Sequence, residues 1–186
     1  MQVTKALPPE EERFCITTTQ LSELIYESVS KLYNMGYKTA DPQLVQMISQ
    51  IIQFYDKKLL IEGFIENSHK LCWDSINKRD EEFFIKNAGE IFKYLPMDKV
   101  DLFKDLFQTK DQNGNHVIEQ DLKNSLWKLF DTMIKISIKY VHKGRKPFST
   151  NNGKEVVSKY SVTFFENVDI AHHATLWNVS LEFPLQ

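Results

Sequence analysis

The chain has 186 residues, enough for one domain with a core, and its formal net charge of −2 gives no overall field that attracts nucleic acid or an anionic membrane. Six glycines and six prolines argue against a small-stranded barrel and against disorder, and two cysteines are too few for a disulfide framework. The sequence contains neither a membrane-span pattern nor a signal-peptide pattern, so we expect a soluble, cytoplasmic protein.

The first predicted feature is an N-terminal arm over residues 1–16. Pro8 and Pro9 are incompatible with a helix interior, and the three glutamates that follow favour a solvated segment. The helical part of the chain, residues 17–143, is predicted to begin with a helix whose first amides are capped by threonine hydroxyls. Gly36 is expected to end this helix, because glycine readily adopts the left-handed conformation found after a helix.

Aspartates mark the starts of the next predicted helices. Asp41 before Pro42 combines a capping side chain with proline at the first helical position. Residues 59–78 are predicted as a further helix, and Asp80 and Asp98 are predicted to cap two more.

Residues 119–142 form the most apolar predicted helix. Its apolar residues recur at steps of three and four and make two adjacent stripes, Leu122, Leu126, Leu129, Met133, Ile136 and Tyr140 beside Trp127, Phe130, Ile134 and Val141. A helix that is apolar over more than half its circumference is surrounded by other helices. The predicted fold is therefore mainly α, a bundle of about six helices around this central helix.

The composition changes after the central helix. Residues 144–186 are predicted to form a basic linker followed by an extended, strand-like tail, because the segment is rich in turn formers and then in Val, Phe, Thr and Trp. Such a tail has no partner strands elsewhere in the chain, so its apolar residues are predicted to bind a partner protein or a second copy, with packing on the chain's own bundle as the alternative. The predicted partner-binding residues are Phe164, Phe165, Leu176, Trp177, Val179, Leu181 and Phe183.

The turn at residues 109–120 has some features of a calcium-binding EF-hand loop. Asp111, Asn113 and Asn115 offer oxygen ligands at alternate positions. No reading frame, however, supplies an acidic first ligand, a glycine at the sixth position and a glutamate at the twelfth together. The favoured prediction is a polar turn in which aspartate and asparagine side chains bond their own backbone and Gly114 takes a positive φ, with calcium binding as the alternative.

Other candidate ligands are sparse. His69 and Cys72 share one side of a predicted helix and could start a zinc site, but a second pair is missing. His172 and His173 are adjacent, and in a strand their side chains would point to opposite faces, so only one could join. We therefore predict no metal site, with Cys72 buried and His69 on an outer face. Asp74 belongs to an acidic cluster that is predicted to form helix caps and a solvated face. No catalytic motif is present, so neither an enzyme nor a cofactor is predicted.

A basic segment follows the central helix. Residues 139–159 contain six Lys or Arg and one Glu, and Lys143, Arg145, Lys146 and Lys154 are the candidate contacts to nucleic-acid phosphates. The overall acidity of the chain makes nucleic-acid binding the alternative rather than the leading prediction.

Residues 60–147 resemble small helical proteins of nucleocytoplasmic large DNA viruses. The resemblance rests on Trp73, the run Arg79-Asp80-Glu81, the pair Phe83-Phe84, and Trp127. It implies a setting in the host cytoplasm or the virion and assigns no residue a role. The leading functional prediction is a non-enzymatic structural or interaction protein, such as a virion component whose terminal arms bind neighbouring subunits.

Overall fold

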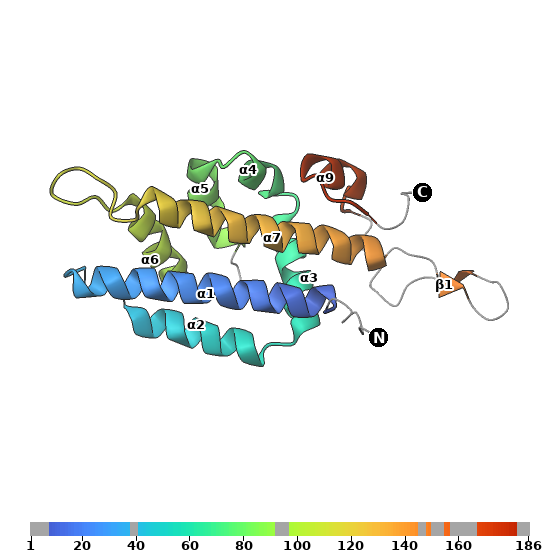
Figure 1. The fold of residues 1–186 in the computed structure, drawn as a ribbon, viewed down its shortest axis with the longest axis horizontal. Coiled ribbons are helices and arrows are strands. Elements are labelled where there is room, and N and C mark those ends of the chain that lie inside the picture. Colours follow the sequence, from blue (N-terminus) through green and yellow to red (C-terminus); the bar gives the residue numbers. More distant parts are fainter. Residues whose placement is uncertain are drawn as a thin grey trace, which may run out of the picture.

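The computed structural model describes residues 8–37, 41–91, 97–144, 148–149, 155–156 and 167–181. These residues are mainly helical and form a bundle, as predicted (Figure 1). The helices are α1 (Glu10–Asn34), α2 (Pro42–Phe54), α3 (Lys57–Ser68), α4 (Trp73–Asn77), α5 (Glu81–Ile91), α6 (Met97–Gln108), α7 (Gln120–Gly144) and α9 (Ile170–Leu176). Two short strands, β1 (Phe148–Ser149) and β2 (Glu155–Val156), pair antiparallel with Phe148 opposite Val156.

The helix α7 is central to the bundle. It packs along α1 on one side and against α4 and α9 on the other (Figure 1). The side chains of both predicted stripes are buried except Leu122 and Leu129, which are partly buried, and Ile134, Ile138 and Val141 are fully enclosed. The bounds of α7 match the predicted helix at residues 119–142 closely, since two apolar stripes leave a helix no stable position except between other helices.

The helix α1 begins at Glu10, so the prediction of an arm extending to residue 16 is wrong for residues 10–16. Pro9 occupies the N-cap position, and three glutamates lie in the first turn, where the positive end of the helix favours them. The hydroxyls of Thr17 and Thr18 donate back to backbone carbonyls four residues earlier, as threonines inside a helix do. Phe14 is consequently a core residue.

The predicted helix at residues 59–78 is two helices. Asp56 caps α3 by accepting a hydrogen bond from the Leu59 amide, and a turn separates α3 from α4. The turn places Trp73 entirely inside the core, where its indole Nε1 donates to Ser68 Oγ at 2.9 Å. Apolar periodicity did not reveal this break because both helices turn apolar residues toward the same core.

The described end of the tail is a helix rather than a strand. Asp169 caps α9 by accepting a hydrogen bond from the His172 amide, and Val168, Ile170 and Trp177 are buried against α4 and α7. Leu176, Val179 and Leu181 pack partly buried on the same core. For residues 167–181 the alternative prediction therefore holds, because these residues pack on their own bundle instead of extending to another chain. Phe164, Phe165 and Phe183 lie outside the described residues.

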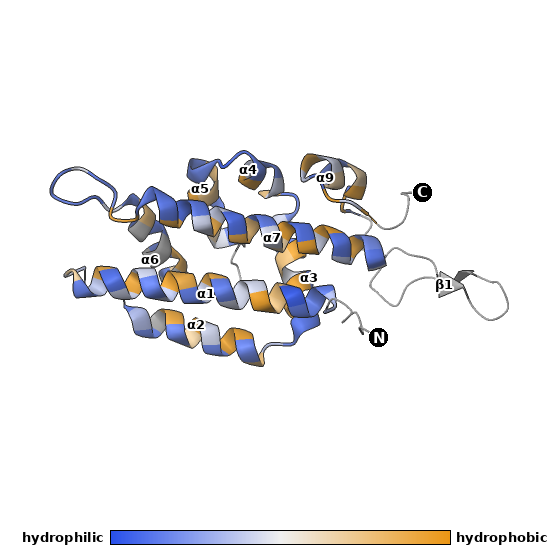
Figure 2. Ribbon diagram, viewed as in Figure 1, coloured by the Kyte–Doolittle hydropathy of each residue, from blue (hydrophilic) through white to orange (hydrophobic). Residues whose placement is uncertain are grey.

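The edge of the bundle is formed by α2, which packs against α1. Figure 2 shows hydrophobic residues along this outer helix as well as in the interior. Among the helices that the structure describes, none combines the length and the apolar character needed to cross a membrane.

Candidate functional site

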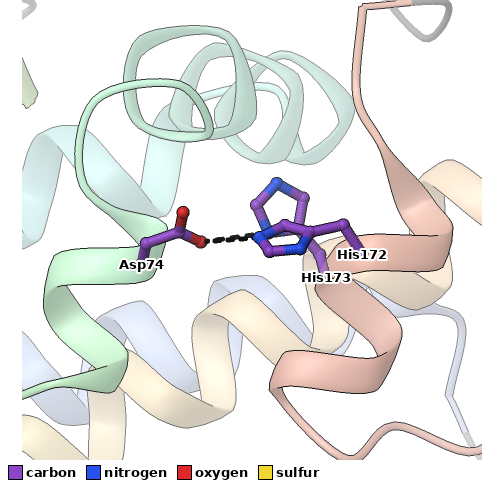
Figure 3. Close-up of side chains that lie close together, drawn as sticks. All are labelled: Asp74, His172 and His173. Carbon is purple, nitrogen blue, oxygen red and sulfur yellow. Dashed lines mark hydrogen bonds and ion pairs between the residues drawn. The ribbon is translucent and has the colours of Figure 1, made fainter.

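Three side chains from two segments that lie 98 positions apart in the sequence meet beside the core. Asp74 lies in α4, and His172 and His173 lie in α9 (Figure 3). The distance from His172 Nε2 to Asp74 Oδ1 is 3.2 Å, and the distance from His173 Nδ1 to the same oxygen is 3.8 Å. One ligand atom from each residue lies within 4.8 Å of the others, so the three can converge on one ion.

The three residues differ in burial. Asp74 and His172 are exposed, whereas His173 is only 6% exposed and packs edge-on against the Trp73 ring with the ring centroids 4.8 Å apart. Burial lowers the pKa of His173, and the nearby Asp74 carboxylate opposes this shift only in part. His173 is therefore held as the neutral imidazole, the form that has a lone pair for a ligand.

The helix α9 explains how two adjacent histidines reach one carboxylate. Neighbouring residues in a helix are rotated by about 100° about the helix axis. Two adjacent histidines therefore cannot both approach one carboxylate oxygen with the same ring nitrogen. His172 uses its distal Nε2, and His173 uses Nδ1, which is closer to the backbone. The prediction that only one of these histidines could join a site assumed a strand and is corrected by the helix.

The other proposed ligands are not part of this cluster. His69 is buried rather than on an outer face, and its Nδ1 donates to the Ile65 carbonyl oxygen at 2.9 Å. Burial raises the pKa of Cys72 to about 12, so its thiol stays protonated, and its Sγ lies 3.4 Å from the Ser68 carbonyl oxygen. The carboxylate that completes the cluster, Asp74, had been assigned to a solvated face, and no local signal pairs it with residues 98 positions away.

Residues 109–120 contain the predicted polar turn, in which a side chain bonds its own backbone. Asp111 Oδ1 accepts hydrogen bonds from the backbone amides of Asn113 at 2.8 Å and Asn115 at 3.0 Å. Gly114 has a φ of 80°, in the left-handed region. The aspartate oxygen thus stabilises the turn itself, as an Asx turn does.

We expect Gly114→Val to lower the free energy of unfolding by about 1–2 kcal/mol, because a β-branched residue resists a positive φ. Asp111→Ala should cost about 1 kcal/mol, since it removes the acceptor of two exposed hydrogen bonds. Urea denaturation with and without Ca²⁺ measures both effects. A stabilisation by Ca²⁺ that disappears in Asp111→Ala would contradict the polar turn and support the calcium-binding alternative.

The basic candidates fall into two groups. Lys143 Nζ lies 3.2 Å from Glu10 Oε2, so its charge is partly neutralised, and Arg145, Lys146 and Lys154 lie outside the described residues. A separate cavity of about 360 Å³ between α1 and α7 is lined by three cationic side chains together with isoleucines and threonines. The cationic side chains are Arg13, Lys135 and Lys139.

The outer face of α2 carries an exposed apolar stripe. Met47, Ile51 and Phe54 recur at steps of four and three and are all exposed, Phe54 by 90%. Tyr55, the C-cap residue of α2, and Leu59, in the first turn of α3, are exposed as well. We call Met47, Ile51, Phe54, Tyr55 and Leu59 the α2 face. The apolar periodicity of residues 42–55 predicts Ile51 and Tyr55 on the buried side of this helix, together with Ile48 and Ile52, and this prediction is wrong for Ile51 and Tyr55, which are exposed.

Comparison of the chain with models of protein families, with curated proteins and with solved structures finds no match, so neither a family nor a relative indicates a role for the cluster or for the α2 face.

Proposed function

We propose that the protein is a non-enzymatic interaction protein that associates with a second copy of itself through the α2 face. The observation that carries this proposal is the stripe of large apolar side chains that α2 exposes to solvent. Placement in a virion, which the resemblance implies, stays a prediction, as does partner binding by Phe164, Phe165 and Phe183.

The α2 face has the character of an interface. The opposite side of α2 packs against the core of the bundle, where Ile52 is buried and Val45 and Ile48 are partly buried. The exposed stripe is therefore additional apolar surface. Contiguous exposed patches of this kind usually mark interaction sites, since removing a Phe or Ile side chain from water is worth about 1.5–3 kcal/mol.

The charge pattern favours a second copy as the partner. No residue from Pro42 to Tyr55 carries a charge, in a chain in which 26% of residues are charged. Two identical faces can therefore meet about a two-fold axis without bringing like charges together. If the two α2 helices are antiparallel, their dipoles point in opposite directions, which is also favourable. A strongly charged partner or an anionic lipid surface would find no complementary charge on residues 42–55.

Replacing Ile51 by glutamate tests the proposal. The wild-type chain is expected to show the mass of a dimer in light scattering at micromolar concentration, and Ile51→Glu the mass of a monomer, because the charge would be buried at the interface. Ile16→Glu is the matched control. Ile16 is 50% exposed and Ile51 54%, but Ile16 lines the cavity between α1 and α7, beside Lys135 and Lys139.

Circular dichroism should show the same helical content in both variants, since both positions are exposed. A wild-type chain that remains monomeric up to its solubility limit would overturn the proposal. Equal dissociation in Ile51→Glu and Ile16→Glu would also contradict it, because the effect would then not belong to the α2 face.

A further inference from the structure

We infer that Asp74, His172 and His173 bind one divalent transition-metal ion, and that Zn²⁺ fits this ligand set. The ion would link α4 to α9 and so attach the end of the chain to the bundle. This inference is independent of the association through the α2 face, because it uses different residues.

The spacing of the ligand atoms suits an ion with tetrahedral coordination. Ligands about 2.1 Å from a tetrahedral Zn²⁺ lie about 3.4 Å from one another. The distances from Asp74 Oδ1 to His172 Nε2 and to His173 Nδ1 are 3.2 and 3.8 Å, which bracket that value. All three atoms lie within 4.8 Å of one another, so movements of about an ångström or less would bring them into one coordination sphere.

A buried nitrogen gives independent support. His173 Nδ1 is inaccessible to solvent and has no hydrogen-bond partner among the described residues, and Asp74 Oδ1 at 3.8 Å is too far to accept one. An unsatisfied buried polar atom destabilises a fold by about 1–3 kcal/mol. Coordination of an ion would satisfy this nitrogen.

The surroundings hold the ligands in place before an ion arrives. The Trp73 ring packs edge-on against His173, and Asn77 Nδ2 donates to the Leu176 carbonyl oxygen at 3.3 Å, which links α4 to the end of α9. Pre-positioned ligands lose little conformational entropy on binding. Because Asp74 and His172 are exposed, the fourth ligand would be a water molecule, as in zinc sites with an open position.

The ligand types determine which ions compete. Two imidazole nitrogens and one carboxylate oxygen suit Zn²⁺ and its transition-metal neighbours, whereas Mg²⁺ and Ca²⁺ prefer all-oxygen sites. The identity of the ion is therefore testable by competition with these hard cations.

The experiment is a calorimetric titration of the full chain with Zn²⁺ after treatment with a chelator. The wild-type chain is expected to bind one ion, and His172→Gln to bind it at least about tenfold more weakly. His116→Gln, which removes an exposed histidine from the turn before α7, is the matched control and should bind as the wild type does. Zn²⁺ should also raise the melting temperature of the wild type and of His116→Gln, because an ion that binds only the folded state stabilises it.

Three results would overturn the inference. The first is a wild-type chain that takes up no Zn²⁺, and the second is a His172→Gln variant that binds as tightly as the wild type. The third is displacement of Zn²⁺ by equimolar Mg²⁺, which would indicate nonspecific attraction to carboxylates. Because His172 is half exposed, its replacement should leave the fold intact, and circular dichroism of the variant verifies this.

Discussion

Trp73→Ala is expected to lower the free energy of unfolding by about 3–5 kcal/mol, the usual cost of truncating a large buried aromatic residue. Trp73 is 0% exposed, its indole Nε1 donates to Ser68 Oγ, and its ring packs against His173 of α9. The substitution would leave a cavity where α4, α9 and the end of α3 meet. Urea denaturation followed by circular dichroism measures the loss.

Trp73→Phe separates packing from hydrogen bonding at this position. Phenylalanine retains much of the ring volume but lacks the N–H donor, so this variant should lose less stability than Trp73→Ala. An unfolding midpoint for Trp73→Ala equal to that of the wild type would mean that the indole is not enclosed as the structure has it.

Removal of residues 167–186 is expected to destabilise the bundle by several kcal/mol. The deletion takes away Val168, Ile170 and Trp177, each 4% exposed or less, and uncovers the side chains of α4 and α7 beneath them. Each such side chain contributes about 1.5–3 kcal/mol through burial. Thermal melting of the full-length and shortened chains gives the comparison.

Trp177→Ala in the full-length chain tests the same packing without a deletion. It should lower the melting temperature while leaving self-association intact, because Trp177 lies in the core and not on the α2 face. A shortened chain that melts at the wild-type temperature but no longer associates would instead favour a tail that serves as an interface, as the sequence alone suggested.

The central architecture was predictable because its signals are local. The two apolar stripes of α7 and the capping aspartates Asp41 and Asp80 are each recognisable within a few residues of sequence. Both aspartates accept backbone hydrogen bonds at helix starts. Such signals can be recognised in the sequence without knowing which elements the helix packs against. The start of α1 was misjudged because the three threonines suit a cap as well as a helix interior, where their hydroxyls bond the preceding turn.

The site was not predictable, for two physical reasons. The segment around His172 has aromatic and β-branched neighbours that favour a strand, and only tertiary packing of Ile170 and Trp177 makes its helix the stable form. The second reason is the long separation in sequence between Asp74 and the two histidines. Hydrophobic periodicity does not indicate which surface of the bundle α9 contacts. The Asp169 cap was the one local signal of α9 available in the sequence.

The hydrogen bond between Asn77 and Leu176 joins residues 99 positions apart and has a kinetic consequence. Closing so long a loop is entropically costly, so α9 is expected to dock after the earlier helices have assembled. A seven-residue helix can also detach without disturbing the hydrogen bonds within α1 or α7. Amide hydrogen exchange in α9 should therefore report a local opening that is easier than global unfolding, and each opening would separate Asp74 from both histidines.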